Sequence, residues 1–321
     1  MYLIGISSIL FFGQTALSHE KSDSSETPAS EPGTYFQRRW VHVSENSAVI
    51  YWQADDISKE ATGFVEYGTT EELGMQTAET KKPRNAQFHR LKGLDPGVTY
   101  FYKMVATDPA VGTRTESELM QLTTSLKEGT LYIPRDLTGT PPYMLGKTNG
   151  HYVLTQDFIA NGTAFIIEGS GITLDLNGHT VIFGNNTTAQ VFGIQVTNGD
   201  TCKVMNGIII QGERSAEYSN AVRSFRSGNR GVEICGISTD VHLKNAQPMV
   251  FRHDNLKIHH NDIYSRVIDL ESRHYPGNVL LRVEANGKNV HLHDNLLTEG
   301  CHRAILVSST TSLTNVEIEF N

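Results

Sequence analysis

A seven-residue pattern in the C-terminal half limits the fold of this chain more than any other feature. The pattern is Asn, apolar, any, apolar, any, any, Asn, and it occurs at 255–261, 289–295 and 315–321. Residues 171–177 fit it with Gly in the first place, and 202–206 and 232–236 are looser relatives. The ends of these six segments lie 25 to 34 residues apart. One short alternating strand in each period of this length predicts a β-solenoid.

In a parallel β-solenoid each coil lays its strand over the previous one, about 4.8 Å away, so equivalent side chains stack in columns. The apolar positions are expected to point into the core: Leu256 and Ile258, Val290 and Leu292, and Val316 and Ile318. The last Asn of each segment is expected to take a left-handed backbone and to bond with the Asn above and below. The final segment ends on Asn321 without a capping element, which predicts a solenoid truncated at its C-terminus.

The start of the repeat region resembles a known family. Residues 151–157 (HYVLTQD) and 172–182 (ITLDLNGHTVI) resemble the opening coils of pectin-lyase-like proteins. The resemblance covers about 130–321 and implies a right-handed parallel β-helix over 151–321. That architecture hosts lyases, hydrolases, epimerases and non-catalytic adhesins. The paired-Asp and Gly-His-Gly motifs of polygalacturonases and the Arg-x-Pro-x-x-Arg motif of pectate lyases are absent, so no family's catalytic residues carry over.

The first half follows a different plan, because Asn occurs twice before residue 145 and eighteen times after it. Residues 47–53 alternate, which places Ala48, Ile50 and Trp52 on one strand face and Val49 and Tyr51 on the other. The turn at 95–97 comes shortly before Tyr100, the position of the tyrosine corner in sandwich folds. This half is therefore expected to be a small β-sandwich.

Two further stretches carry a resemblance for the sandwich. Together with Trp52, residues 93–106 (GLDPGVTYFYKMVA) resemble a fibronectin type III domain, and with 65–70 (VEYGTT) they resemble the N-terminal module of purple acid phosphatases. The resemblance covers 35–124 and implies a spacer or docking module. The metal-ligand motifs of those phosphatases have no counterpart, so phosphatase activity is not implied. The predicted fold class is all-β, a fibronectin type III-like sandwich followed by the β-helix.

The remaining segments predict the cellular location of the protein and the connections between its domains. Residues 1–18 are apolar up to a small-residue site at Ala16 and Ser18, which predicts a signal peptide and a secreted, periplasmic or cell-surface protein. Residues 19–34 are rich in Ser, Glu and Pro and predict a disordered linker. Residues 125–150 contain four Gly and three Pro and predict an irregular connector. No later apolar run approaches the ~18 residues of a membrane span, so the mature chain is expected to have none.

Charge and cysteine content exclude other classes. The net charge is −8 without any block rich in Lys or Arg, so nucleic acid is not an expected partner. Three cysteines are too few for a disulfide framework and lack zinc-finger spacing.

The outward positions of the repeat form two columns of polar side chains, one of Lys257, His291 and Glu317 and one of His259, His293 and Glu319. A second group of charged residues follows along the sequence, between Arg266 and Arg303. β-Elimination of a uronate polysaccharide requires a cation to neutralise the sugar carboxylate and a base to remove the C5 proton. The candidates for the cation are Arg266, Arg273, Arg282 and Arg303, and those for the base are His259, His293, His274 and Lys257. Ca²⁺ held by carboxylates is compatible with a lyase, although the sequence requires no cofactor.

Three functions stay open. The first is a polysaccharide lyase acting on an acidic glycan. It is favoured over a glycoside hydrolase. A hydrolase needs two carboxylates at a defined separation, and the sequence offers only i, i+2 pairs that each lie on one strand. The second is a non-catalytic adhesion or carbohydrate-binding protein. The third is a metal-handling β-helix with His259, His293 and Glu319 as ligands. Arg, His and carboxylate groups around one groove would favour an enzyme, and scattered groups would favour an adhesin.

Overall fold

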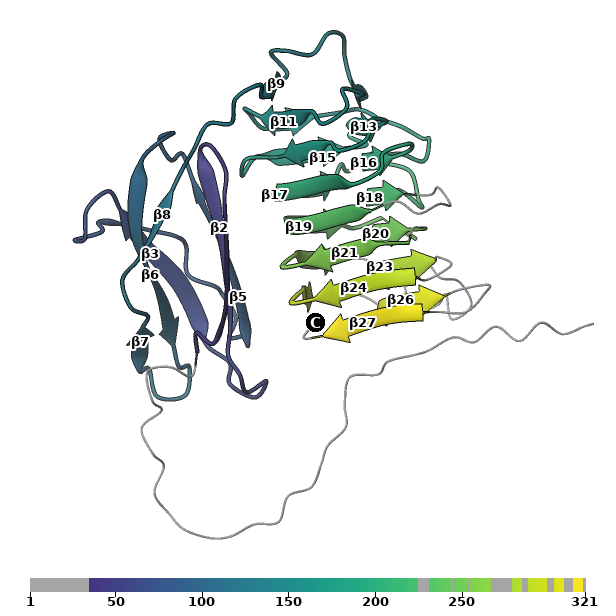
Figure 1. Ribbon diagram of the computed structural model, residues 1–321. Coiled ribbons are helices and arrows are strands. Elements are labelled where there is room, and N and C mark those ends of the chain that lie inside the picture. The colour runs from purple at the N-terminus through teal and green to yellow at the C-terminus, as the bar shows by residue number, and fades with distance from the viewer. Residues whose placement is uncertain are drawn as a thin grey trace, which may run out of the picture.

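The computed structural model describes residues 35–224, 231–243, 245–252, 254–266, 279–284, 288–298, 303–308 and 314–319. The regular elements in these ranges are all β-strands. They form an antiparallel sandwich and a parallel solenoid that lie side by side (Figure 1). The expected signal peptide at 1–18 and linker at 19–34 lie outside the described residues. Within the described ranges, no helix is long and apolar enough to cross a membrane.

The sandwich consists of two antiparallel sheets. The three-stranded sheet has the order β1-β2-β5, with β1 Arg38–Val43, β2 Ser47–Gln53 and β5 Ala86–Lys92. The five-stranded sheet has the order β4-β3-β6-β7, with β8 also paired to β6; its bounds are β3 Thr62–Gly68, β4 Met75–Gln76, β6 Thr99–Thr107, β7 Arg114–Glu116 and β8 Met120–Thr123. The Tyr100 hydroxyl accepts a hydrogen bond from the Asp95 backbone N–H at 2.9 Å. This is the type of contact that a tyrosine corner makes.

The solenoid has three faces. The first face contains β9 Leu131–Ile133, β11 His151–Leu154, β14 Thr173–Asp175, the first half of β17 Cys202–Gln211 and of β19 Val232–Val241, then β21 Leu256–His259, β24 Lys288–His293 and β27 Thr314–Glu319. The second face contains β12 Phe158–Ile159, β15 Thr180–Phe183, the second half of β17 and β19, β22 Asp262–Ser265 and β25 Leu296–Thr298.

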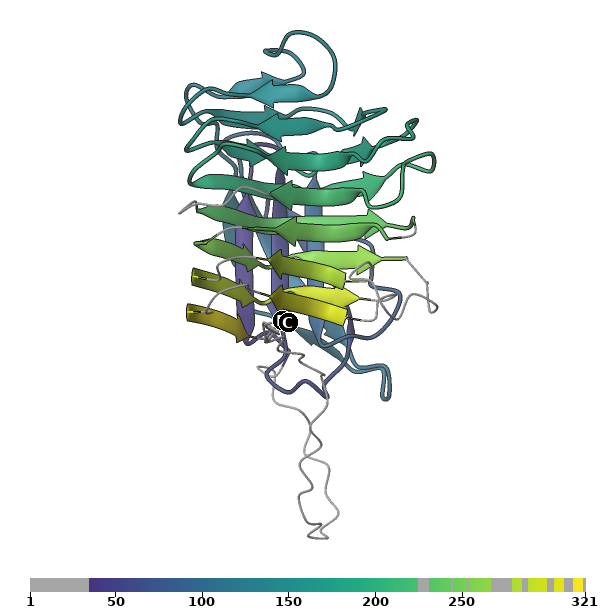
Figure 2. The ribbon, with the colours of Figure 1, turned by 90° about the vertical axis from the view of Figure 1, so that its right-hand side faces the viewer.

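The third face is a seven-stranded sheet on the side away from the sandwich (Figure 2). Its strands are β10 Tyr143–Leu145, β13 Phe165–Ile167, β16 Phe192–Val196, β18 Asn220–Ser224, β20 Gln247–Phe251, β23 Val279–Glu284 and β26 Arg303–Ser308. Regular pairing begins within 125–150, the segment expected to be an irregular connector: β9 pairs with β11, and β10 pairs with β13. The sequence missed these strands because each has three residues among Gly and Pro.

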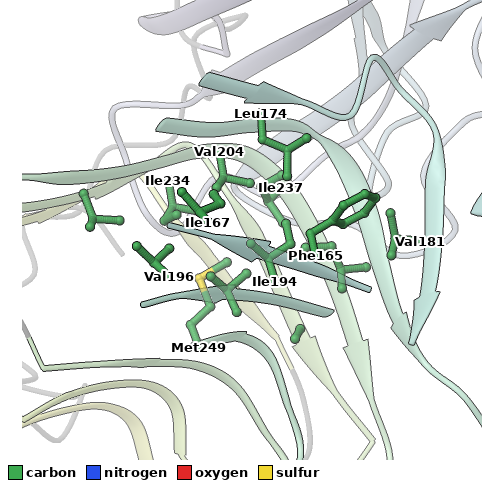
Figure 3. Packing of buried hydrophobic residues seen from close by; sticks show 14 of the residues in the cluster. Phe165, Ile167, Leu174, Val181, Ile194, Val196, Val204, Ile234, Ile237 and Met249 are labelled. Atoms are coloured by element: carbon green, nitrogen blue, oxygen red, sulfur yellow. The ribbon is translucent and has the colours of Figure 1, made fainter. Parts of the chain in front are cut away.

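The apolar positions of the repeat stack as expected. One inward column runs through Leu174, Val204, Ile234, Ile258 and Leu292 on successive coils. All five side chains are fully buried. Figure 3 shows this packing from close by, where Leu174, Val204 and Ile234 meet residues from the other faces such as Ile167 and Val196. The predicted parallel β-helix is therefore confirmed as the architecture of the second domain.

Two asparagine ladders run along the solenoid. The exposed ladder joins the first Asn of each repeat, since Asn289 Nδ2 donates to Asn255 Oδ1 at 2.7 Å and Asn315 Nδ2 donates to Asn289 Oδ1 at 2.8 Å. The buried ladder joins the last Asn, with 2.9 Å between Asn261 Nδ2 and Asn295 Oδ1.

The final residue has the predicted left-handed backbone in the segments that end at Asn177 (φ 47°), Asn206 (φ 49°) and Gly236 (φ 65°). In the heptads 255–261 and 289–295 the prediction was wrong, because the residue before the final Asn is the left-handed one. His260 has φ 51° and Asp294 has φ 52°. Asn261 and Asn295 instead turn their amides inward and bond to backbone, which is possible because the preceding residue makes the turn.

Replacing Asn261 with alanine is expected to lower the free energy of unfolding by about 3 kcal/mol. The Asn261 amide accepts a hydrogen bond from Ile237 N–H and donates to Ile234 O and Asn295 Oδ1, so its loss leaves buried polar groups unpaired, at about 1–3 kcal/mol each. Chemical denaturation measures the loss. Asn289→Gly is the control: it removes an exposed ladder amide and keeps the left-handed backbone (φ 56°) accessible. Equal losses in the two variants would contradict the importance of the buried ladder.

The three-stranded sheet of the sandwich is covered on both sides. Ala48, Ile50 and Trp52 of β2 face the sandwich core, and Val49 and Tyr51 face the solenoid, where Leu296 packs against their cluster. All five of these side chains are at most 1% exposed. In Figure 1, β2 and β5 accordingly lie on the side of the sandwich next to the solenoid. The sandwich is therefore packed against the β-helix rather than held apart from it as a spacer.

Buried His89 is expected to make the sandwich sensitive to acid. Burial, assisted by the charge of Arg84, lowers the pKa of His89 from 6.5 to about 3. Below pH 6.5 the unfolded chain binds a proton that the folded chain does not, so stability falls as the pH drops from about 6.5 to about 3, by up to about 1.4 kcal/mol per pH unit. Denaturation at several pH values measures this slope. His89→Gln is expected to reduce the slope, and an unchanged slope would contradict the assignment.

Candidate functional site

The first face of the solenoid carries an exposed column of charged side chains. On successive coils the register aligns Lys203, Glu233, Lys257, His291 and Glu317, and we call this set the outer column. Lys203 Nζ lies 3.1 Å from Glu233 Oε1, and His291 Nδ1 lies 2.8 Å from Glu317 Oε2. The side chains of His291 and Glu317 are 39% and 54% exposed. The sequence predicted this column from Lys257 to Glu317, and the register confirms it.

The neighbouring column lies under the sandwich. On successive coils it contains Asp175, Met205, Cys235, His259, His293 and Glu319, so the register confirms the predicted alignment of His259, His293 and Glu319. The sequence predicted His259 and His293 as outward groups and candidate bases, but His259 is only 4% exposed. The prediction was wrong for His259 because the repeat pattern defines which side chains point out of the solenoid and does not reveal what covers them. Here the cover is β1 of the sandwich.

Aromatic contacts between the domains are centred on Trp40 of β1. Its ring stacks on His260 with centroids 4.6 Å apart and meets the edge of His259 at 5.8 Å. His260 also meets Tyr51 at 4.9 Å, and His259 stacks on His293 at 4.9 Å with nearly parallel rings. Offset and edge contacts of this kind stabilise a packed arrangement beyond their buried area. The imidazoles are thereby held in fixed orientations.

Hydrogen bonds connect these rings to carboxylates. Glu233 Oε1 lies 3.1 Å from His259 Nε2, and the Nδ1 atoms of His259 and His260 are 2.7 Å apart. The bond with His259 holds the pKa of Glu233 at about 2, and burial lowers the pKa of His260 to about 3. Glu233 is therefore ionised and His260 neutral at physiological pH.

A second carboxylate lies on the next coil. Asp294 Oδ2 is 2.8 Å from His293 Nδ1 and 3.6 Å from His260 Nε2, and Asp294 Oδ1 accepts a hydrogen bond from Arg38 Nη1 at 2.9 Å. Arg38 belongs to β1, so this contact crosses the domain interface. Neither Asp294 nor Arg38 was predicted from the sequence. The alternation of Arg38, Trp40 and His42 on one face of β1 is the signal that could have revealed Arg38.

The described residues contain two groups of side chains whose potential metal-binding atoms lie within 4.8 Å of one another. The first is Glu233, Cys235 and His259, and the second is His260, His293 and Asp294. Neither contains Glu319, so the predicted set of His259, His293 and Glu319 is replaced by two others. In the first group Lys203 already neutralises Glu233, and burial raises the pKa of Cys235 to about 12. That group is therefore the weaker ligand set for a cation.

The predicted arginines do not join the first face. Arg266 is half-exposed and bonds to Asp240 at 2.8 Å on the second face. Arg303 begins β26 on the third face, where Arg282 also lies. Arg273 and His274 lie outside the described residues. Of the predicted site residues, the first face therefore brings together Lys257, His259 and His293.

No protein-family model and no curated protein matches this chain. Three solved structures show what the chain is similar to. A pectate lyase of Pectobacterium carotovorum is 9% identical with a TM-score of 0.32, over 88% of this chain and 91% of that one. A pectate lyase of Erwinia chrysanthemi is 11% identical with a TM-score of 0.30, over 85% and 89%. A family 28 exopolygalacturonase of Yersinia enterocolitica is 10% identical with a TM-score of 0.36, over 87% and 82%. Values this low do not transfer an activity to this chain.

Proposed function

We propose that this protein binds an acidic polysaccharide along the outer column and cleaves it by β-elimination. One observation carries the proposal: an exposed His291–Glu317 pair with 2.8 Å between Nδ1 and Oε2 lies one coil from Lys257. A carboxylate that accepts the Nδ1 proton leaves the lone pair on Nε2, which is the tautomer that a general base requires. Lys257 is exposed and supplies the positive charge that a uronate carboxylate needs.

In the proposed reaction Lys257 pairs with the C6 carboxylate and so favours the charge that develops when C5 is deprotonated. His291 Nε2 takes the C5 proton, and Glu317 stabilises the imidazolium that forms. The electron pair of the C–H bond becomes the C4–C5 double bond, the C4–O bond breaks, and the leaving oxygen takes up a proton from solvent. The products are a new chain end and an unsaturated uronate.

His291 replaces the histidines first expected to act as bases. His259 is buried and already bonded to Glu233, so a sugar cannot reach its Nε2 atom without separating the domains. A base must lie within hydrogen-bond reach of the proton that it removes. The side chain of His291 is 39% exposed, so a sugar bound on this face can reach its Nε2 atom.

The proposal extends to the rest of the chain. We propose that the sandwich is a fibronectin type III-like module that fixes β1 beside the outer column, and that residues 1–18 direct export. Support comes from the packing of β2 against the solenoid and from the apolar run of the N-terminus. A secreted location would give the protein access to extracellular glycans.

The decisive experiment incubates the full chain with polygalacturonate, with alginate and with a neutral glucan. Ultraviolet absorbance follows unsaturated uronate, and a reducing-end assay follows all cleavage. Absorbance that rises with reducing ends for one uronate polymer is the expected result. Reducing ends without absorbance would indicate hydrolysis and overturn the proposal. Retention on an acidic polymer with neither product would favour the non-catalytic binding protein instead.

A further inference from the structure

We propose that His260, His293 and Asp294 bind one zinc-type ion beneath the sandwich, at a site that the elimination chemistry does not use. The candidate ligand atoms are His260 Nε2, His293 Nδ1 and Asp294 Oδ2, which lie within 4.8 Å of one another. Two imidazole nitrogens and one carboxylate oxygen suit zinc or a similar transition metal, with a fourth position for water.

The hydrogen-bond pattern directs the lone pair of His260 into this space. Glu233 is a carboxylate, so His259 donates its Nε2 proton to it and has its lone pair on Nδ1. His260 must then donate its Nδ1 proton to His259 across the 2.7 Å contact. This leaves the lone pair of His260 on Nε2, which faces Asp294 Oδ2 at 3.6 Å. A metal ion can bind both of these acceptors, and it would displace the proton through which His293 Nδ1 contacts Asp294 Oδ2 at 2.8 Å.

The same pattern provides the outer contacts that metal sites need. A metal-bound histidine usually donates its other ring N–H to an acceptor, which fixes the tautomer and the ring orientation. His260 would do so through His259 to Glu233, and Trp40 covers its ring face. Arg38 holds the other oxygen of Asp294, so Oδ2 stays directed toward the two imidazoles.

The backbone conformation of His260 determines where its ring lies. The turn that separates the first and second faces places Asn206, Gly236, His260 and Asp294 at φ values of 49°, 65°, 51° and 52°. Asn, Asp and His are the non-glycine residues that adopt left-handed backbone most often, so this turn accommodates a histidine. The turn sets the His260 ring above Asp294 of the next coil.

An ion at this site would connect β21 to β24 directly under β1. It would therefore stabilise the coils against which Trp40 and Arg38 pack. Because the side chain of His293 is 28% exposed, the site keeps one side open for entry.

The test uses the full chain after treatment with a chelator. Calorimetric titration with Zn²⁺ is expected to show one site, and Co²⁺ is expected to give the intense visible bands of a tetrahedral ion. Asp294→Asn, which is nearly isosteric, and His293→Gln are expected to weaken Zn²⁺ binding about 100-fold or more. His151→Gln, a histidine on the same face outside the cluster, is expected to bind as the wild type does.

Several results would overturn the proposal. One is the absence of stoichiometric Zn²⁺ binding by the wild type. Another is a wild-type affinity in Asp294→Asn, measured where its circular dichroism shows a folded chain. Loss of binding in Glu233→Gln alone, with Asp294→Asn unaffected, would assign the ion to the other group. Because the readout is metal stoichiometry, the result is independent of whether any polysaccharide is cleaved.

Discussion

Replacing His291 with alanine is expected to lower the rate of unsaturated-product formation by about 10²- to 10⁴-fold, the usual contribution of a general base. The loss should fall on kcat, because the imidazole acts on the C5 proton and the carboxylate of the sugar is held by Lys257. Lys257→Gln should instead raise KM as well as lower kcat, since it removes a charge that also binds the ground state. Initial rates of ultraviolet absorbance over a range of polymer concentrations separate the two parameters.

The control for this prediction is His179→Ala. His179 forms the same type of exposed pair, with 3.2 Å between its Nδ1 and Asp157 Oδ1, but it precedes β15 on the second face. Its replacement is expected to leave the rate within twofold of the wild type. Equal losses in the two variants, or an active His291→Ala, would remove His291 from the mechanism and leave the outer column as a binding surface.

The strands of the solenoid were predictable because the repeat records a local rule. A side chain that alternates inward on one coil is stacked on its equivalent in the next, so Leu256, Ile258, Val290 and Leu292 could be placed from spacing alone. The same rule placed Lys257 and His291 in one outward column. Period and alternation are sufficient for this because every coil makes the same contacts with its neighbours.

The burial of His259 beneath the sandwich was not predictable from the repeat. Whether His259 meets water or Trp40 depends on where a separate domain packs, and nothing in the heptad describes that domain. The sandwich did contain a signal: Val49 and Tyr51 are apolar on the face of β2 opposite Ile50 and Trp52. A strand that is apolar on both faces must pack against another element on each face. The identity of the second cover depends on tertiary packing, which spacing does not encode.

Removing the guanidinium that joins the two domains is expected to destabilise the docked protein strongly. Arg90 of β5 is largely enclosed between the two domains, and this burial lowers its pKa to about 10, so it is still a cation at pH 7. It donates to Asn206 Oδ1 at 3.2 Å, to Gly207 O at 3.1 Å and to Gly236 O at 2.8 Å. Hydrogen bonds from a charged group contribute about 1.5–3 kcal/mol each. Arg90→Met keeps the aliphatic stem and is expected to lower the free energy of unfolding by about 5 kcal/mol.

Denaturant unfolding measures this loss, and small-angle scattering measures whether the domains separate. The control is Arg114→Met, which removes a guanidinium that lies 5.4 Å from the ring centroid of Phe64. Arg114 is exposed and pairs with Glu66 and Glu116, and such surface pairs contribute about 0–1 kcal/mol. A larger radius of gyration in Arg90→Met alone is expected, because the carbonyls of Gly207 and Gly236 then gain hydrogen bonds only by meeting water. Equal stabilities and equal radii in the two variants would show that apolar packing around Tyr51 and Trp40, rather than Arg90, holds the sandwich on the solenoid.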